Sequence, residues 1–321
     1  MEFKEISLSD LRLKDRRFNF TLDEPDEKFL ASVRQVGITE PVKIKAEDGS
    51  LILVTGWKRM ESARAGGLKK IPVRILPAGL TDLEILRLAF FENYPQRDFS
   101  LAEKALLVKK FLEFGLSQEE LIREILPRLQ LPPERPTIET LVKLAALDRA
   151  LPGIHRGRWK LATARLFLSF PLEEQKLIVG LAGAFNHNQQ AELIDLLFTL
   201  KKRQAKPLAA ILSEQEIEPL VKEMKEGKPP AADRLLTALR EKALPRLSCL
   251  NREIQAAIKK INLPGQGRLN YDQTLEKTGV SIWLEARSKD ELESALKNLN
   301  ESLKAGEWDT LFKILNNKID E

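Results

Sequence analysis

The chain has few of the residues that build disulfide frameworks and metal centres. Its 321 residues include one cysteine, Cys249, and two histidines, His155 and His187. A single cysteine excludes a disulfide framework and any site that needs several thiols. One cysteine and two distant histidines also give no zinc-binding pattern and no catalytic triad. Thiol chemistry and zinc catalysis are therefore not the functions to expect.

Long apolar runs and a strong charge imbalance are missing too. No apolar segment approaches the length of a membrane span, and the first residues, Met-Glu-Phe-Lys-Glu, show no signal-peptide pattern. We therefore expect a cytoplasmic protein with no membrane partner. The net charge is +5, from 52 basic and 47 acidic residues, so any affinity for nucleic acid must come from local clusters of charge.

What the chain does have is a strand, a glycine and a short basic helix near its start. Residues 51–54 form an apolar run of strand length, and Gly56 allows a tight turn into a helix that begins near Trp57. Backbone amides at the start of this helix, together with Lys58 and Arg59, would suit an anion such as phosphate. On spacing alone, a plain structural turn is the simpler interpretation.

Two motifs around this turn resemble those of the ParB-like partition proteins, which belong to the ParB and sulfiredoxin-like superfamily. That family carries G-E-R-R-x-R-A after its hairpin, and here the residues are Gly56-Trp-Lys-Arg-Met-Glu-Ser-Ala63. It carries E-N-x-Q-R-x-D before its helical domain. Here Glu92 and Asn93 are followed, with the Gln-Arg pair displaced by one position, by Gln96, Arg97 and Asp98. The resemblance covers residues 1 to about 180.

The resemblance implies a pocket for cytidine triphosphate (CTP) with Mg²⁺. Glu92 is the candidate magnesium ligand and the candidate catalytic carboxylate. Trp57 replaces the acid of the first motif and Glu61 stands where its third arginine belongs, so we expect weakened binding and leave hydrolysis open. The implied pocket residues are Gly56, Trp57, Lys58, Arg59, Glu92, Asn93, Gln96 and Arg97.

From Ser100 onward the hydrophobic pattern is helical. Ser100 with Glu103, and Ser117 with Glu120, form two capping boxes, which predict helices at 101–114 and 117–126. In the partition proteins the second of these opens a helix-turn-helix, whose next helix enters the major groove of DNA.

The segment that follows departs from the family pattern. Residues 127–136 hold four prolines and no glycine, and Thr137 is expected to cap a helix over 138–147. Thr137, Thr140 and Lys143 are its candidate DNA contacts. A buried packing helix is an equally good interpretation.

The most basic run in the chain comes next, with no acidic residue between positions 149 and 172. Cations with an interleaved aromatic, Trp159, suit contacts to DNA phosphates. A solvated helix edge, with Trp159 packed on the core, is the alternative. The candidate phosphate contacts are Arg156, Arg158, Lys160 and Arg165, the last within a segment that resembles the partition-protein pattern L-x-x-G-H-A-R-A-L-L.

The last part of the chain reads as helix, strand, strand and helix. The expected strand 280–286 has one apolar face, and Ser288 with Glu291 caps a final helix with a leucine stripe. The element order resembles the dimerisation domain of partition proteins. We expect a predominantly helical α+β fold with four parts: a ParB/sulfiredoxin-like α/β domain at 1–95, a helical DNA-binding domain at 96–206, a helical linker at 207–244 and an αββα homodimerisation domain at 245–321.

Three functions are compatible with these patterns. The first is a dimeric, nucleotide-gated DNA clamp or adaptor in chromosome or plasmid partition or transcription regulation, associated with the nucleoid and with a partition ATPase as a candidate partner. The second is an enzyme on the same N-terminal fold: a sulfiredoxin is excluded because Trp57 stands where it needs cysteine, whereas a small-molecule kinase has Glu61 and Glu92 as candidate acids. The third is a degenerate paralogue that serves as a protein-interaction scaffold.

Overall fold

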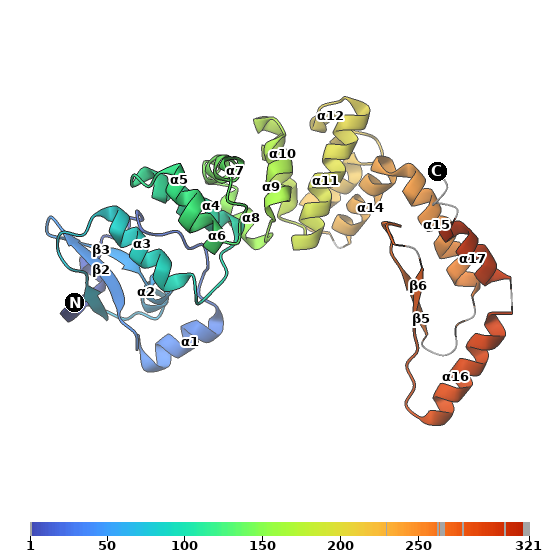
Figure 1. Ribbon diagram of the computed structural model, residues 1–321, viewed down its shortest axis with the longest axis horizontal. Helices are drawn as coiled ribbons and strands as arrows, with labels where there is room; N and C mark the ends of the chain where they lie inside the picture. The colour runs from blue at the N-terminus through green and yellow to red at the C-terminus, as the bar shows by residue number, and fades with distance from the viewer. Residues whose placement is uncertain are drawn as a thin grey trace. The chain divides into compact units, whose positions relative to one another are not determined.

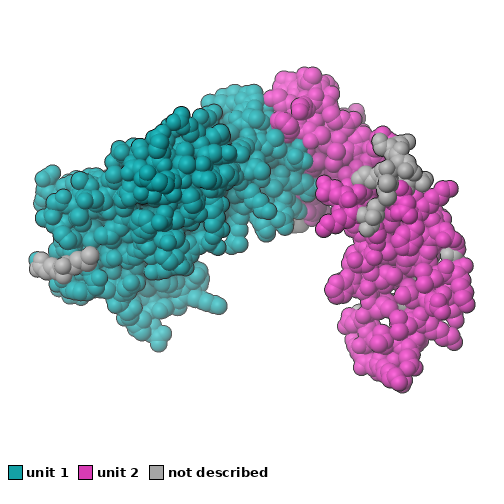
Figure 2. Space-filling model, in the orientation of Figure 1, with its two compact units in different colours: residues 1–195 teal, residues 196–321 magenta. Residues whose placement is uncertain are grey.

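The computed structural model describes residues 2–228, 230–261, 263, 267–277, 279–304 and 306–316. The chain forms two compact units, residues 1–195 and residues 196–321 (Figure 2). The fold is a predominantly helical α+β arrangement, as the sequence predicts (Figure 1). The finer division at residues 95, 206 and 244 stays a prediction. In the part of the chain that is described, no helix combines the length and the apolar character that a membrane span requires.

A mixed four-stranded sheet forms the centre of the N-terminal part, in the order β1-β4-β2-β3. The outer pairs are antiparallel, whereas β2 and β4 run parallel. The strands are β1 (Glu2–Ser7), β2 (Val42–Glu47), β3 (Ser50–Thr55) and β4 (Lys70–Ile75).

Asp48 and Gly49 form the turn between β2 and β3. Both residues have positive φ, 48° and 71°, and Glu47 pairs with Ser50 across the loop. A two-residue loop with positive φ at both positions is the type I′ turn, whose twist matches that of the strands it joins. Strand β1 was not predicted, because its residues mix charged and apolar side chains and its Phe3 is exposed at the sheet edge.

Three helices accompany this sheet: α1 (Glu27–Val36), α2 (Trp57–Ala65) and α3 (Asp82–Asn93). Each of α1 and α3 begins at a side-chain cap, Asp26 for α1 and Thr81 with Glu84 for α3. The core beneath α2 contains Val42, Ile44, Leu53, Trp57 and Met60, all buried. This packing fixes the start of α2 against the ends of β2 and β3.

The middle of the chain is entirely helical in its described residues. Both predicted capping boxes are confirmed, at Ser100 with Glu103 and at Ser117 with Glu120. The helices are α4 (Leu101–Glu113), α5 (Gln118–Glu120), a π-helical turn (Leu121–Ile125), α6 (Leu126–Arg128), α7 (Arg135–Ala145), α8 (Leu151–Arg156), α9 (Leu161–Leu168), α10 (Leu172–Ala182) and α11 (His187–Gln204).

The expectations about the proline-rich segment were partly wrong. The helix does not stop before Pro127. In the π-helical turn, Leu126 N–H bonds to Leu121 O, and this turn accommodates Pro127, which has no N–H to donate. Thr137 does not cap the next helix: α7 begins at Arg135, with Glu134 at the N-cap position. Pro136 lies in the first turn of α7, where no intrahelical N–H bond is lost. The turn between α6 and α7 is therefore only residues 129–134.

The second unit continues with α12 (Leu208–Leu212), α13 (Glu218–Lys225), α14 (Ala231–Ala243) and α15 (Pro245–Lys260). A hairpin of β5 (Arg268–Tyr271) and β6 (Val280–Trp283) follows, and then α16 (Lys289–Ser302) and α17 (Glu307–Asn316). Ser288 caps α16 as predicted, by accepting from Glu291 N–H. Strand β6 ends at Trp283, three residues earlier than expected.

The core of the C-terminal part rests on a helix that was not predicted. Trp308, Leu311 and Leu315 of α17 are buried with Ile254 and Ala257 of α15. Helix α16 instead leaves Leu292 and Leu296 exposed, and Leu303 directly after it is exposed too. The leucine stripe after Ser288 thus belongs largely to an open surface.

Candidate functional site

The start of α2 depends on a glycine that no other residue could replace without a shift. Gly56 has φ of 96°, a conformation that side chains disfavour. A Cβ at this position would lie 2.6 Å from Val42 Cγ1. Gly56 is also the N-cap residue and supplies no side-chain bond to the first-turn amides. These amides are therefore available to an acceptor from outside the helix.

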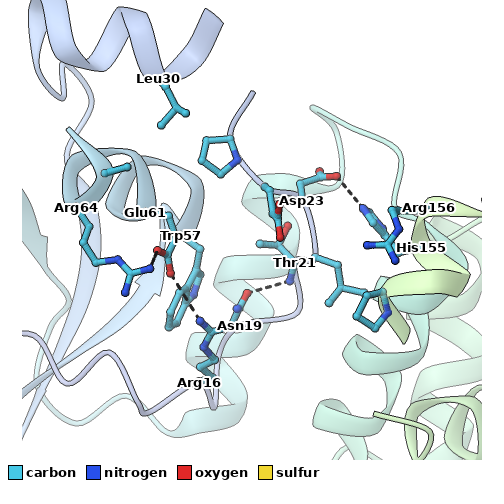
Figure 3. A pocket seen from close by; sticks show the side chains of 15 residues that line it. Arg16, Asn19, Thr21, Asp23, Leu30, Trp57, Glu61, Arg64, His155 and Arg156 are labelled. Carbon is cyan, nitrogen blue, oxygen red and sulfur yellow. Dashed lines mark hydrogen bonds and ion pairs between the residues drawn. The ribbon is translucent and has the colours of Figure 1, made fainter. Parts of the chain in front are cut away.

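Trp57 anchors the helix in the core. Its side chain is only 6% exposed, and the guanidinium of Arg16 lies 5.4 Å from its ring centre. Its indole Nε1 is buried without a hydrogen-bond partner. Glu61, on the next turn, pairs with Arg64 at 2.7 Å and with Arg16 at 3.6 Å. The acid that replaces the family's third arginine is thus neutralised by two arginines of this chain (Figure 3).

The two cations of the first turn have different neighbours. Lys58 Nζ lies 5.5 Å from the ring centre of Phe29 in α1. Arg59 Nη1 donates to the carbonyl oxygens of Glu40 and Pro41, at 2.8 and 3.1 Å, and pairs with the Glu40 carboxylate at 3.0 Å. Arg59 thereby holds the segment that leads into β2.

A cavity of about 260 Å³ lies at the start of α2. Six of the eight predicted pocket residues line it, and they come from two segments about forty positions apart: Gly56, Trp57, Lys58, Arg59, Asn93 and Arg97. The two others do not line it. Glu92 is paired with Lys43 at 2.6 Å, and Gln96 is exposed in the turn after α3.

Arg97 is held by two carboxylates. Its Nη1 lies 2.7 Å from Asp23 Oδ2 and 3.0 Å from Glu103 Oε1, and its Nη2 donates to Thr21 Oγ1 at 2.6 Å. His155 of α8 completes this group, with Nε2 3.2 Å from Asp23 Oδ1 and Nδ1 2.7 Å from Ser100 Oγ. We call Asp23, Arg97, Glu103 and His155 the Arg97 cluster.

Glu103 is the buried member of this cluster, with 1% of its surface exposed. Burial alone would raise the pKa of its carboxyl group, but the Arg97 guanidinium and the N–H groups of Leu22 and Ser100 lower that pKa overall. Asp23, Glu103 and His155 also have ligand atoms within 4.8 Å of one another, a spacing compatible with a metal ion. Arg97 already pairs with both carboxylates of this group.

Sequence reasoning missed Asp23 and His155 as parts of the site. Nothing in the local pattern marks Asp23, because its partners are more than seventy residues away. Glu103 gave a signal as a helix cap and by its register with the second family motif, and His155 as one of two histidines and as part of the acid-free basic run. Asp23, His155 and Arg156 also line two further cavities, of about 790 and 880 Å³. The first is drawn in Figure 3.

Basic residues line the second of these cavities along a connector between α8 and α9. Residues 156–160, which we call the basic connector, alternate between exposed cations and buried residues: Arg156, Arg158 and Lys160 are exposed, and Gly157 and Trp159 are buried. Trp159 Nε1 donates to Gln190 Oε1 at 2.7 Å, and its ring meets Phe167 edge to face. Trp159 therefore packs on the core, as the alternative of a solvated helix edge predicted, while the three cations face solvent.

The candidate groove-reading helix places its threonines inward. Thr137 is 0% exposed and Thr140 is 8% exposed, with its hydroxyl donating to Pro136 O. Only Lys143 of the three predicted contacts is exposed. Arg165 of α9 pairs with Glu134 at 2.8 Å and donates to Thr137 Oγ1. As they stand here, the two threonines are not available to DNA, and Arg165 holds the start of α7.

Known partition proteins resemble this chain in sequence, although no family model matches it. The chromosome-partitioning protein Spo0J of Thermus thermophilus is 30% identical over 208 residues, which are 63% of this chain and 74% of that protein. The chromosome-partitioning protein ParB of Myxococcus xanthus is 25% identical over 162 residues, 50% of this chain and 52% of that protein. The chain therefore spans about half the length of this second relative.

Two solved structures of the C-terminally truncated chromosome-partitioning protein ParB from Caulobacter crescentus also resemble the chain. One, complexed with CTP-gamma-S, is 22% identical with a TM-score of 0.27, over 60% of this chain and 99% of that chain. The other, complexed to the centromeric parS site, is 18% identical with a TM-score of 0.29, over 72% and 96%. Because the Thermus protein is 30% identical and is matched over 74% of its length, the chain belongs to the ParB/Spo0J family of chromosome-partitioning proteins.

Proposed function

We propose that this chain is a DNA-associated partition protein that binds a cytidine nucleotide at the start of α2. One observation carries the proposal: residues of two separate motif segments, 56–59 and 93–97, line one cavity. The cavity combines uncapped helix amides, a lysine and two arginines, which are the groups that bind phosphate oxygens. The preference for cytidine rests on the motifs that resemble those of the family.

In this proposal the helix amides and Lys58 bind the phosphates, and Asn93 and Arg97 bind from the opposite segment. Mg²⁺ would accompany a triphosphate, with Glu92 as its protein ligand. Lys43 lies 2.6 Å from the Glu92 carboxylate, so a metal ion at Glu92 requires that Lys43 move away. Hydrolysis is not part of the proposal, because Glu61 and Glu92 are both paired with cations.

Calorimetry with cytidine, adenosine and guanosine triphosphates tests the nucleotide site. We expect heat with the cytidine nucleotide and about tenfold weaker binding in Lys58→Ala, which loses a charged contact to phosphate. Lys69→Ala is the matched control, since Lys69 is exposed and lies outside the cavity. If no nucleotide binds to the natural chain, this part of the proposal is wrong.

For DNA, we propose that the basic connector makes most of the contacts. Arg156, Arg158 and Lys160 are exposed on one short segment that contains no acid, which suits phosphate contact. The connector offers few side chains for base edges, and Thr137 and Thr140 are buried. Affinity should therefore fall steeply with salt and differ little between unrelated sequences. Fluorescence anisotropy on two unrelated duplexes at two salt concentrations tests both points.

We further propose that the chain acts as a homodimer through residues 245–321, in association with the nucleoid and with a partition ATPase as partner. Support for the dimer comes from apolar side chains that the C-terminal part leaves exposed: Ile282, Trp283, Leu292, Leu296 and Leu303. An exposed apolar surface of this kind is typical of a protein interface.

A scaffold without nucleotide is the second candidate function. It is favoured by the fact that Arg59 and Arg97 already have protein partners and that Trp57 fills the position of the family's acid. The same calorimetry separates the two: a cytidine nucleotide that binds to the natural chain and loses affinity in Lys58→Ala rules out the scaffold.

A further inference from the structure

Asp23 connects the candidate nucleotide cavity to helix α8. Its Oδ2 lies 2.7 Å from Arg97 Nη1, and both residues line the cavity at the start of α2. Its Oδ1 lies 3.2 Å from His155 Nε2 (Figure 3). His155 is in α8, and the next residue, Arg156, begins the basic connector. One carboxylate therefore bonds both a cation of the cavity and a residue beside the basic connector.

The charges of the Arg97 cluster do not leave room for another anion. Arg97 contributes one positive charge, and Asp23 and Glu103 contribute two negative charges. A phosphate that approaches Arg97 while both carboxylates stay in place would meet the negative charges of Asp23 and Glu103. One carboxylate must therefore leave Arg97 before a phosphate can bind to it.

Asp23 is the carboxylate that can leave. Glu103 is 1% exposed and also accepts bonds from Thr21 Oγ1, Leu22 N–H and Ser100 N–H, so its displacement would strand a buried charge. Asp23 is 41% exposed and lies on the irregular segment before α1. Water can solvate its carboxylate once the bond to Arg97 is broken.

We propose that the Asp23 carboxylate is an internal counter-anion that occupies a phosphate position on Arg97, and that a nucleotide displaces it and so releases His155 of α8. This inference rests on the proposed nucleotide function and adds a positioning residue to it. Displacement costs His155 its contact with Asp23 and leaves the hydrogen bond to Ser100 and the 4.0 Å contact with the Glu103 carboxylate. Phosphate binding in the cavity is thereby communicated to α8 and to the basic connector that follows it.

Asp23→Asn tests the counter-anion directly. The amide keeps the size of the side chain and removes the negative charge, so a cytidine triphosphate should bind about three- to tenfold more tightly. Damage to the fold would change affinity in the opposite direction. Glu24→Gln is the matched control: Glu24 is exposed, lines the neighbouring cavity and loses the same charge without touching Arg97 or His155. We expect a change of less than about twofold in this control.

Histidine resonances give a second readout on the same full-length chain. The chain has two histidines, and His187 is exposed and remote in sequence from the cluster, so it serves as an internal reference. In the natural chain, adding the nucleotide should move the ring signal of His155 and leave that of His187 in place. In Asp23→Asn, the His155 signal should be displaced before nucleotide is added and should respond little to it.

The possible results separate this inference from the nucleotide proposal. Binding with an unmoved His155 signal, or with equal affinity in Asp23→Asn and the natural chain, overturns the counter-anion and leaves the nucleotide site intact. If no nucleotide binds to the natural chain or to either variant, the nucleotide proposal fails and the counter-anion fails with it.

Discussion

At the residue scale, the backbone at the start of α2 and the cavity beside it depend most on the absence of a side chain at Gly56. Gly56→Ala combines an unfavourable positive φ with a Cβ that meets Val42, so it should lower the free energy of unfolding by about 2–4 kcal/mol. Gly67→Ala is the control, because Gly67 also has positive φ but nothing lies within 4 Å of an added Cβ. Its cost should be only about 1–2 kcal/mol. Urea unfolding measures the free energy of unfolding of both variants. Equal losses would contradict a close approach of Val42 to position 56.

Glu103 should make stability depend on pH in the acid range. Its pKa is lowered in the folded chain, so the folded state favours the carboxylate and the unfolded state binds the proton more readily. This contribution is present above the ordinary pKa of 4.5 and is lost as the pH falls below it. The natural chain should therefore lose more unfolding free energy than Glu103→Gln between pH 7 and pH 4. If the unfolding free energies of the two proteins change equally with pH, Arg97 does not lower the pKa of Glu103 as described.

Arg97 shows how far a sequence motif reaches. The motif places Arg97 at the same pocket as Gly56, and both residues line the cavity at the start of α2. Its partners Asp23 and Thr21 lie on a segment more than seventy residues earlier, and no local pattern reports such a pairing. The sequence thus predicted that Arg97 lies near a pocket, but not that the Asp23 carboxylate pairs with it.

At the scale of elements, the basic connector is held in shape by Gly157. A Cβ there would lie 2.0 Å from Gln190 Oε1 and 2.7 Å from Trp159 Nε1, so Gly157→Ala should break the bond between those two side chains. We expect about 2–4 kcal/mol of lost stability together with weaker binding to DNA. Gly153→Ala, in the preceding helix α8 with no atom near an added Cβ, is the control and should be neutral or slightly stabilising. Similar thermal unfolding of the two variants would contradict this role.

Local chemistry predicted where α4 and α5 begin, but not which way α7 faces. The capping serines Ser100 and Ser117 act on their own helices through bonds three residues long, so they could be recognised without the fold. The burial of Thr137 and Thr140 depends on packing of α7 against α4 and α9. The periodicity of a helix gives its apolar stripe but does not show that two threonines lie within it.

At the scale of the whole molecule, the exposed leucines of α16 predict a homodimer. Sedimentation velocity of the full chain should show a dimer at micromolar concentration. Replacing Leu296 and Leu303 by glutamate should give a monomer, because it places charge on the surface proposed to pair. Leu172→Glu, at an equally exposed leucine of α10, should remain a dimer. A monomeric natural chain would contradict the proposal.

We propose that this partition-family chain holds DNA through the phosphate contacts of its basic connector. The most direct test compares the salt dependence of duplex affinity for three full-length proteins by fluorescence anisotropy. They are the natural chain, the triple alanine variant of Arg156, Arg158 and Lys160, and a control with alanine at Lys222, Lys225 and Lys228, three exposed lysines of the second unit.

We expect the triple variant to bind every duplex more weakly, with a salt slope smaller by about 3, one for each lost phosphate contact. The control has the same net charge as the triple variant of the basic connector, but it should bind DNA like the natural chain. Equal salt slopes for all three proteins, or a sharp preference for one duplex that survives high salt in the triple variant, would rule out this role for the basic connector.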